Sequence, residues 1–181
     1  MITPLFLYFA QFPSRQGTLA LATKGTSTRP AYGEYIEALG DTPDDRRIPG
    51  LDHYIFAQDI DDITQRLDRL AGTFLFVDYG EINLSCTHPH HATAQYRLAV
   101  TIAERMPASA DPLERVIAAD HTLSLLHTLH AHMVDDAEQG NPPLDLCRDT
   151  IHDAIITPFA AAELQAYGWT LLLTVEGGGT K

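Results

Sequence analysis

The stretch AQYRLAVTIAERM, residues 94–106, alternates between apolar and polar side chains. Tyr96, Leu98, Val100 and Ile102 form one set, and Gln95, Arg97, Thr101 and Ala103 form the other. Successive side chains of a β-strand point to opposite faces of its sheet, so this pattern predicts a long strand. Since one of the two sets is mostly polar, we expect an antiparallel sheet that covers a core on one side only.

A long helix is expected soon after this strand. Asp111 is typical of an N-cap and Pro112 of a first helical position, which predicts a helix from Pro112 to about Asp136. Apolar residues and one histidine then recur at helical spacing: Val116, Ala119, Leu123, Leu126, His130 and Met133. We expect this stripe to pack on the sheet.

Further segments complete an α+β pattern. A helix is expected where Ile60, Ile63, Leu67 and Leu70 recur, and TFLFVDYGEINLS (73–85) predicts two short strands with a bulge or bend at Gly80. IITPFAAAEL (155–164) and YGWTLLLTVEG (167–177) predict two final strands joined near Tyr167 and Gly168. The fold expected is α+β, an antiparallel sheet of about four to five strands with two main helices packed on one face.

The first fifty residues form a less regular segment. GTLALATK (17–24) reads as a strand and GEYIEALG (33–40) as a short helix. We therefore expect residues 1–50 to be an N-terminal appendage to an α+β domain of residues 51–181. Phe6, Tyr8 and Phe9 either complete the chain's own core or remain available for contact with another subunit.

Charge and hydropathy narrow the classes of partner. The chain has 24 acidic and 12 Lys or Arg residues, a net charge of −12, and its basic residues are scattered. Such a surface repels a duplex phosphate backbone, so we expect no sequence-specific nucleic-acid binding. The start of the sequence is not typical of a signal peptide, and no run of about 18 apolar residues occurs, so we expect no signal peptide, no membrane association and a cytoplasmic or virion location. Cys86 and Cys147, which form no CxxC pair, fit a reducing compartment.

The stretch SCTHPHHAT, residues 85–93, holds the weak candidates for a metal site, His88, His90 and His91. Zinc needs imidazole or thiolate ligands that converge, and a polar loop around Pro89 offers these ligands no fixed frame. The favoured interpretation is a solvent-exposed loop. A metal-dependent hydrolase that uses the three histidines with an acidic residue such as Asp78 is an alternative.

No other pattern names a reaction. His121, His127, His130 and His132 lie in the long predicted helix, where only His127 and His130 share a face. Neither Ser85 nor Cys86 lies in a nucleophile elbow, and no glycine-rich phosphate loop is present in the sequence. We therefore expect no catalytic residue and no cofactor, and the balance is against an enzyme.

Four stretches carry a resemblance to a known family: GTFLFVDYGEINLS, AQYRLAVTIAERM, SLLHTLHAHM and YGWTLLLTVEG. In the order of their segments and in their residue types, residues 58–176 resemble the phage tail terminator and tail-completion proteins. That family places a helix before a three-stranded antiparallel sheet, then a second helix and a last strand.

The resemblance implies a structural assembly protein of a phage or prophage tail, which forms a ring without catalysis and without a cofactor. Its implied partners are further copies of itself, the tail tube and the head-side connector, with DNA passing through an acidic lumen. An acidic adaptor that binds another protein in an unknown pathway is the alternative to this assignment.

Overall fold

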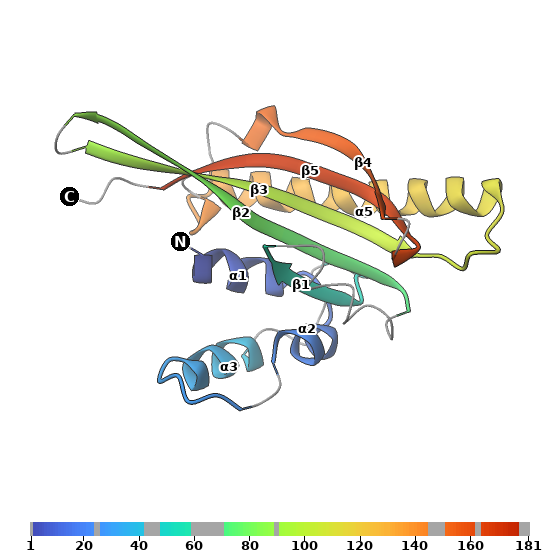
Figure 1. Ribbon diagram of the computed structural model, residues 1–181, viewed down its shortest axis with the longest axis horizontal. Helices are drawn as coiled ribbons and strands as arrows, with labels where there is room; N and C mark the ends of the chain where they lie inside the picture. Colours follow the sequence, from blue (N-terminus) through green and yellow to red (C-terminus); the bar gives the residue numbers. More distant parts are fainter. Residues whose placement is uncertain are drawn as a thin grey trace.

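The computed structural model describes residues 2–23, 26–41, 48–58, 71–88, 91–144, 151–161 and 164–177. A five-stranded sheet runs through the molecule in the order β1-β2-β3-β5-β4 (Figure 1). The strands are β1 (His53–Ala57), β2 (Thr73–His88), β3 (His91–Arg105), β4 (Ile155–Ala161) and β5 (Ala166–Gly177). Together with its helices, this sheet confirms the predicted α+β fold.

The sheet is mixed, whereas the sequence predicted an antiparallel one. β1 pairs with β2 in parallel, and the other three pairings are antiparallel. A parallel pair needs a crossover of about a dozen residues or more, and residues 58–72 between β1 and β2 are long enough to supply it. The predicted helix that contains Ile60, Ile63, Leu67 and Leu70 falls in this connection, outside the described residues.

The segment around Gly80 belongs to one continuous strand, β2, and the expectation of two short strands was wrong. The register between β2 and β3 shifts between Asp78 and Glu81, which is the predicted bulge. The backbone N–H of Gly80 donates to Asp78 Oδ1 at 2.8 Å, so the extra residue of the bulge is held by a side chain. The bulge therefore bends β2 without ending it.

The long helix is α5 (Pro112–Glu138), and its predicted start is confirmed. Asp111 accepts a hydrogen bond from the Glu114 N–H at 2.9 Å, and Glu114 Oε2 accepts one from the Asp111 N–H at 2.8 Å, forming a capping box. The buried face differs from the predicted stripe, because it contains Ala118, Thr122, Leu125, Leu126, Leu129, Met133, Asp136 and Ala137. Val116, placed in the predicted stripe, is 63% exposed.

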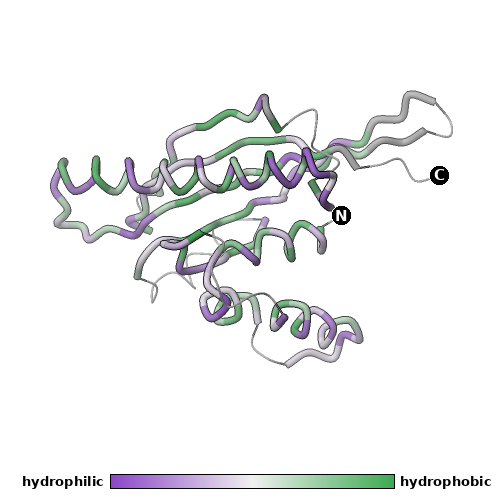
Figure 2. The backbone as a smooth tube through the Cα atoms, turned by 180° about the vertical axis from the view of Figure 1, so that it is seen from behind, coloured by the Kyte–Doolittle hydropathy of each residue, from purple (hydrophilic) through white to green (hydrophobic). Residues whose placement is uncertain are grey.

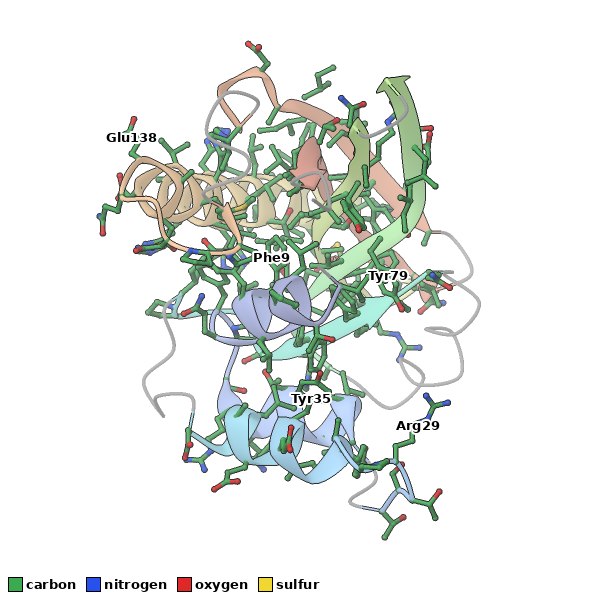
Figure 3. The ribbon with its side chains drawn as sticks, turned by 90° about the vertical axis from the view of Figure 1, so that its left-hand side faces the viewer. Phe9, Arg29, Tyr35, Tyr79 and Glu138 are labelled. Carbon is green, nitrogen blue, oxygen red and sulfur yellow. The ribbon has the colours of Figure 1, made fainter. Side chains whose placement is uncertain are left out.

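Helix α1 (Ile2–Ala10) contributes to the same core as α5 and the sheet. Leu5 and Phe9 are fully buried there, and Figure 3 shows α1 with Phe9 beside α5. Tyr8 donates its hydroxyl proton to the buried Asp136 at 2.8 Å, which joins α1 to the last turn of α5. Tyr8 and Phe9 thus complete the chain's own core; the boundary predicted at residue 50 stays a prediction.

Helix α2 (Arg15–Ala22) replaces the strand that the sequence predicted from residue 17. Ser14 caps it, accepting a hydrogen bond from the Gly17 N–H at 3.1 Å. Gly17 lies so close to the main chain that a Cβ there would overlap the carbonyl oxygen of Asp52. The predicted short helix is present as α3 (Tyr32–Gly40), next to α2 and on the far side of α1 from α5 (Figures 1 and 3).

The two faces of the sheet are covered unequally. The face toward α1 and α5 carries the main core, including Leu75, Val100 and Leu173. The opposite face, expected to be polar, carries a smaller apolar cluster of Ile55, Phe74, Phe76, Ala103, Leu164 and Ala166, against which Leu21 of α2 packs. Toward β4 this face opens to solvent, where Ile155 is 62% and Leu172 is 42% exposed. We call it the open face.

The last two strands confirm the sequence prediction, but their junction lies earlier than expected. Tyr167 and Gly168 are inside β5, paired with Glu104 and Ala103 of β3, and the junction is at residues 162–165. A Cβ at Gly168 would overlap the carbonyl oxygen of Ile102. Glycine at this position therefore allows β5 to lie close to β3, and it does not form a turn.

We expect the unfolding free energy of Tyr54→Phe to fall less steeply with pH than that of the wild type at alkaline pH. Tyr54 is 1% exposed and donates to the Phe6 carbonyl at 2.9 Å; burial, and then Tyr79, raises the pKa of Tyr54 well above its ordinary 10.0. The unfolded chain loses this proton first, so the stabilisation is complete below pH 10.0 and is lost as the pH rises through the folded pKa.

Urea unfolding from about pH 9 to about pH 11 should therefore show a steeper loss of unfolding free energy for the wild type than for Tyr54→Phe. The variant should also be about 1 kcal/mol less stable at neutral pH, where it lacks one hydrogen bond. Tyr35→Phe, at a position 39% exposed, is the control and should follow the wild type. Equal slopes for the wild type and Tyr54→Phe would contradict the assignment.

Candidate assembly surfaces

Two histidines of the SCTHPHHAT stretch, His88 and His91, lie at the far end of a long β-hairpin. His88 ends β2 and His91 begins β3, and their backbones face each other in the register of the pair. The structure describes the backbone at these two positions, and His90 lies outside the described residues. Their metal binding therefore stays an untested hypothesis.

Asp78 is not near His88 or His91 within one chain. It lies ten residues before His88 on the same strand, which places the two about 33 Å apart at about 3.3 Å per residue. Among the described residues, no group of three or more His, Cys, Asp or Glu side chains is arranged to hold a metal ion.

The helical histidines have separate environments along α5. His130 is half-buried, and its Nε2 lies 2.9 Å from the carbonyl oxygen of Ile151. His121 Nδ1 lies 3.3 Å from Glu104 Oε2, while His132 packs its ring against Phe12 at 6.0 Å between centroids. His127 is exposed on the outer side of the helix. These contacts fix the helix against its neighbours, and they do not gather the four rings into one site.

The hairpin of β2 and β3 extends past the end of β1, while β5 stays paired with β3 as far as Ala94 (Figure 1). β1 pairs with β2 only as far as Asp78, so from residue 81 onward β2 has its neighbour β3 on one side. We call residues 81–88 and 91–97 the arm. Its side chains alternate: Ile82 and Leu84 are on the face that continues the main core, and Glu81 and Asn83 are on the other.

The exposed apolar side chains of the arm are Ile82, 43% exposed, and Leu84, 80% exposed. Within the sheet their cross-strand neighbours are Tyr96 and Ala94, and Tyr96 is in turn paired with the fully buried Val175. The apolar face of the core therefore runs on to β2 without a cover among the described residues. We call Ile82 and Leu84 the arm patch.

An ion pair holds the arm in register on its polar face. Arg97 Nη1 lies 3.1 Å from each carboxylate oxygen of Glu81, and Asn83 Nδ2 donates to Glu81 Oε1 at 3.2 Å. Hydrogen bonds from Arg97 and then from Asn83 hold the pKa of Glu81 below its ordinary value. The contacts lie immediately after the bulge, so they orient the strand that carries the arm patch.

A second exposed apolar group lies at the start of α5. Leu113 is 66%, Val116 63% and Ile117 61% exposed, and their i, i+3, i+4 spacing places them on one face of the helix. At 3.6 residues per turn, this face lies roughly opposite the buried Ala118, so it points away from the sheet. We call these three residues the helix patch.

The helix patch has a fixed frame. The capping box of Asp111 and Glu114 defines where α5 begins. Arg115 lies with its guanidinium carbon 5.5 Å from the centroid of the Tyr167 ring, and Ala118 packs with Met106 and Ala110 beneath the helix. A surface ordered before binding loses less entropy when a partner docks on it.

The open face holds a shallow groove of about 740 Å³ between β2 and β4. Its charged lining includes Asp78, Glu81 and Arg97, but Asp78 is bonded to the Gly80 N–H and Glu81 to Arg97. The groove presents Ile155 and Leu172 as its exposed apolar side chains.

Sequence reasoning missed both patches. It did not single out Ile82 and Leu84, because TFLFVDYGEINLS was interpreted only as two short strands with a bulge or bend at Gly80. It placed Val116 in the packing stripe of the long helix. The signal that could have found the helix patch is the apolar triplet of Leu113, Val116 and Ile117 beside the N-cap, before the sheet-packing stripe begins.

Comparison of the chain with family models, with curated proteins and with solved structures found no match. Among the described residues, none of the helices has the length and apolar character needed to cross a bilayer. The function is therefore inferred from the residues and their geometry.

Proposed function

We propose that this chain is a structural assembly protein that associates with further copies of itself and works without catalysis. The observation that carries the proposal is the pair of exposed apolar patches, one on the arm and one at the start of α5. These regions lie at opposite ends of the long axis of the molecule (Figure 1). Two different patches at opposite ends favour a head-to-tail contact, which closes into a ring when the rotation between subunits permits it.

The specific form that we propose is a ring of the phage tail terminator or tail-completion kind. Two observations support this form. One is the resemblance of residues 58–176 to that family, and the other is a fold with a long helix on one face of the sheet and an extended hairpin. Its partners would be the tail tube and the head-side connector. A net charge of −12 suits a ring whose lumen lets DNA pass without adhering to it.

Negative-stain electron microscopy of the concentrated protein tests this proposal. We expect annular particles of uniform diameter with a central hole. Addition of purified tail tubes should place such particles at tube ends, if the tail assignment is correct. Dispersed particles of single-subunit size, with or without tubes, would contradict both the ring and the tail assignment.

A further inference from the structure

The groove on the open face crosses four strands of the sheet. Its floor is one cross-strand row, in which Ala99 of β3 lies between Asp78 of β2 and Leu172 of β5, and Leu172 lies next to Ile155 of β4. Helix α5 lies across the other face of the sheet, as the view from behind shows (Figure 2). From β2 to β4 the row covers three strand spacings, about 14 Å, and it is aliphatic beyond Asp78.

A carboxylate lies at each end of this row. Asp78 is on β2, and Asp153 lies just before Ile155, the first residue of β4. Asp78 accepts a hydrogen bond from the Gly80 N–H at 2.8 Å, which leaves its second carboxylate oxygen without a partner among the described residues. The Asp153 side chain is exposed and has no hydrogen bond or ion pair with a described residue. Both carboxylates can therefore accept hydrogen bonds from a ligand.

The other two charges of the groove balance each other. Arg97 Nη1 lies 3.1 Å from both carboxylate oxygens of Glu81, so this cation is already paired. With three carboxylates and one guanidinium, the described lining has a net charge of −2, which Asp78 and Asp153 supply. A complementary ligand carries positive charge at two separated points and is apolar between them.

From these observations we infer that the groove binds an aliphatic polyamine. One ammonium group donates to Asp78 and another to Asp153, while the methylene chain lies on Ala99 and Leu172. A single metal ion is a poor match, because its ligands must all lie within about 2.6 Å of it and the two carboxylates are at opposite ends of the row. A lysine side chain of a partner protein supplies one cation and leaves the other carboxylate unpaired. The site is on the open face and does not depend on the proposed self-association.

Isothermal titration calorimetry of the full chain with spermidine, at low ionic strength, tests the two carboxylates. Asp78→Asn and Asp153→Asn should each weaken binding about tenfold, since each removes one charge-assisted hydrogen bond. Asp78→Asn keeps an amide oxygen for the Gly80 N–H, so the bulge should persist. Glu34→Gln, at an exposed position on α3, removes the same charge elsewhere and is the matched control, which should bind spermidine like the wild type.

Amines of different length test the spacing. Putrescine, a shorter diamine, reaches one carboxylate at a time and should bind about tenfold more weakly than spermidine. Hexaamminecobalt(III) carries the same charge as spermidine without the aliphatic chain, and its binding should be weaker by a similar factor. In Asp153→Asn, spermidine and putrescine should bind with nearly equal affinity, because one free carboxylate remains.

Several results would overturn the polyamine site. Equal spermidine affinity of the wild type, Asp78→Asn and Asp153→Asn would place the binding elsewhere, and no measurable binding to the wild type would exclude it. Hexaamminecobalt(III) that binds as tightly as spermidine would mean attraction by net charge alone. A loss confined to one of the two variants would mean that the groove holds a single ammonium group, as a lysine of a partner protein supplies.

Discussion

Gly17→Ala is expected to destabilise the protein by about 3 kcal/mol, although alanine is the better helix former. Inside a helix the exchange normally gains about 1 kcal/mol. Here a Cβ would overlap the Asp52 carbonyl oxygen, which belongs to the main chain and cannot rotate away. α2 would have to move off the segment leading into β1, which breaks the 2.9 Å hydrogen bond from Ser14 Oγ to the same carbonyl. Urea unfolding of the variant measures the loss.

Gly33→Ala is the matched control for this prediction. Gly33 lies in α3, and a Cβ there would meet nothing within 4 Å. Its replacement should leave stability unchanged or raise it by up to about 1 kcal/mol. A Gly17→Ala protein as stable as Gly33→Ala would mean that α2 does not pack against Asp52 as described.

Phe9→Ala is expected to cost about 3–5 kcal/mol of unfolding free energy, the largest effect that we predict. Phe9 is 0% exposed and contacts the rings of Tyr8 and Phe12, with centroid distances of 5.2 and 6.3 Å. Its removal leaves a cavity between α1, the sheet and α5. Since small domains are stable by about 5–15 kcal/mol, the variant should unfold at markedly lower denaturant concentration.

Ile2→Ala, in the same helix but 38% exposed, controls for loss of helix α1 itself and should cost less than about 1 kcal/mol. A shift for Phe9→Ala no larger than that for Ile2→Ala would contradict a role of α1 in the main core.

Local signals predicted the parts of the fold that local chemistry determines. The alternation around Val100 predicted β3, and the Asp111-Pro112 pair predicted the start of α5, because strand pleat and helix capping act within a few residues. A bulge or a bend at Gly80 was also predicted from local sequence, and the structure has the bulge. All three are confirmed.

Sequence patterns gave wrong predictions where contacts between residues far apart in the sequence determine the structure. GTLALATK (17–24) was predicted to be a strand, but the Ser14 cap and the close contact of Gly17 with Asp52 place residues 15–22 in a helix. The parallel pairing of β1 with β2 depends on the crossover between them, so the sequence of β1 alone does not predict it. On α5, the face that packs is set by the sheet, so Val116 was assigned to the wrong side.

The candidate surfaces were the hardest part to predict from sequence. An apolar side chain such as Leu84 is expected to be buried. It is 80% exposed because β2 continues beyond the end of β1, which only the structure shows. Leu113, at the start of α5, is likewise an apolar side chain that is exposed in the structure. Their exposure in an otherwise strongly acidic chain is the physical basis of the proposed assembly.

The mass of the wild-type protein in solution, measured by light scattering over a wide concentration range, tests the central claim most directly. A closed ring predicts one plateau at an integer multiple of 19.9 kDa, unchanged by further concentration. A mass of 19.9 kDa at every concentration up to roughly 500 µM, equivalent to a dissociation constant weaker than that value, would contradict self-association. A mass that rises without a plateau would contradict ring closure.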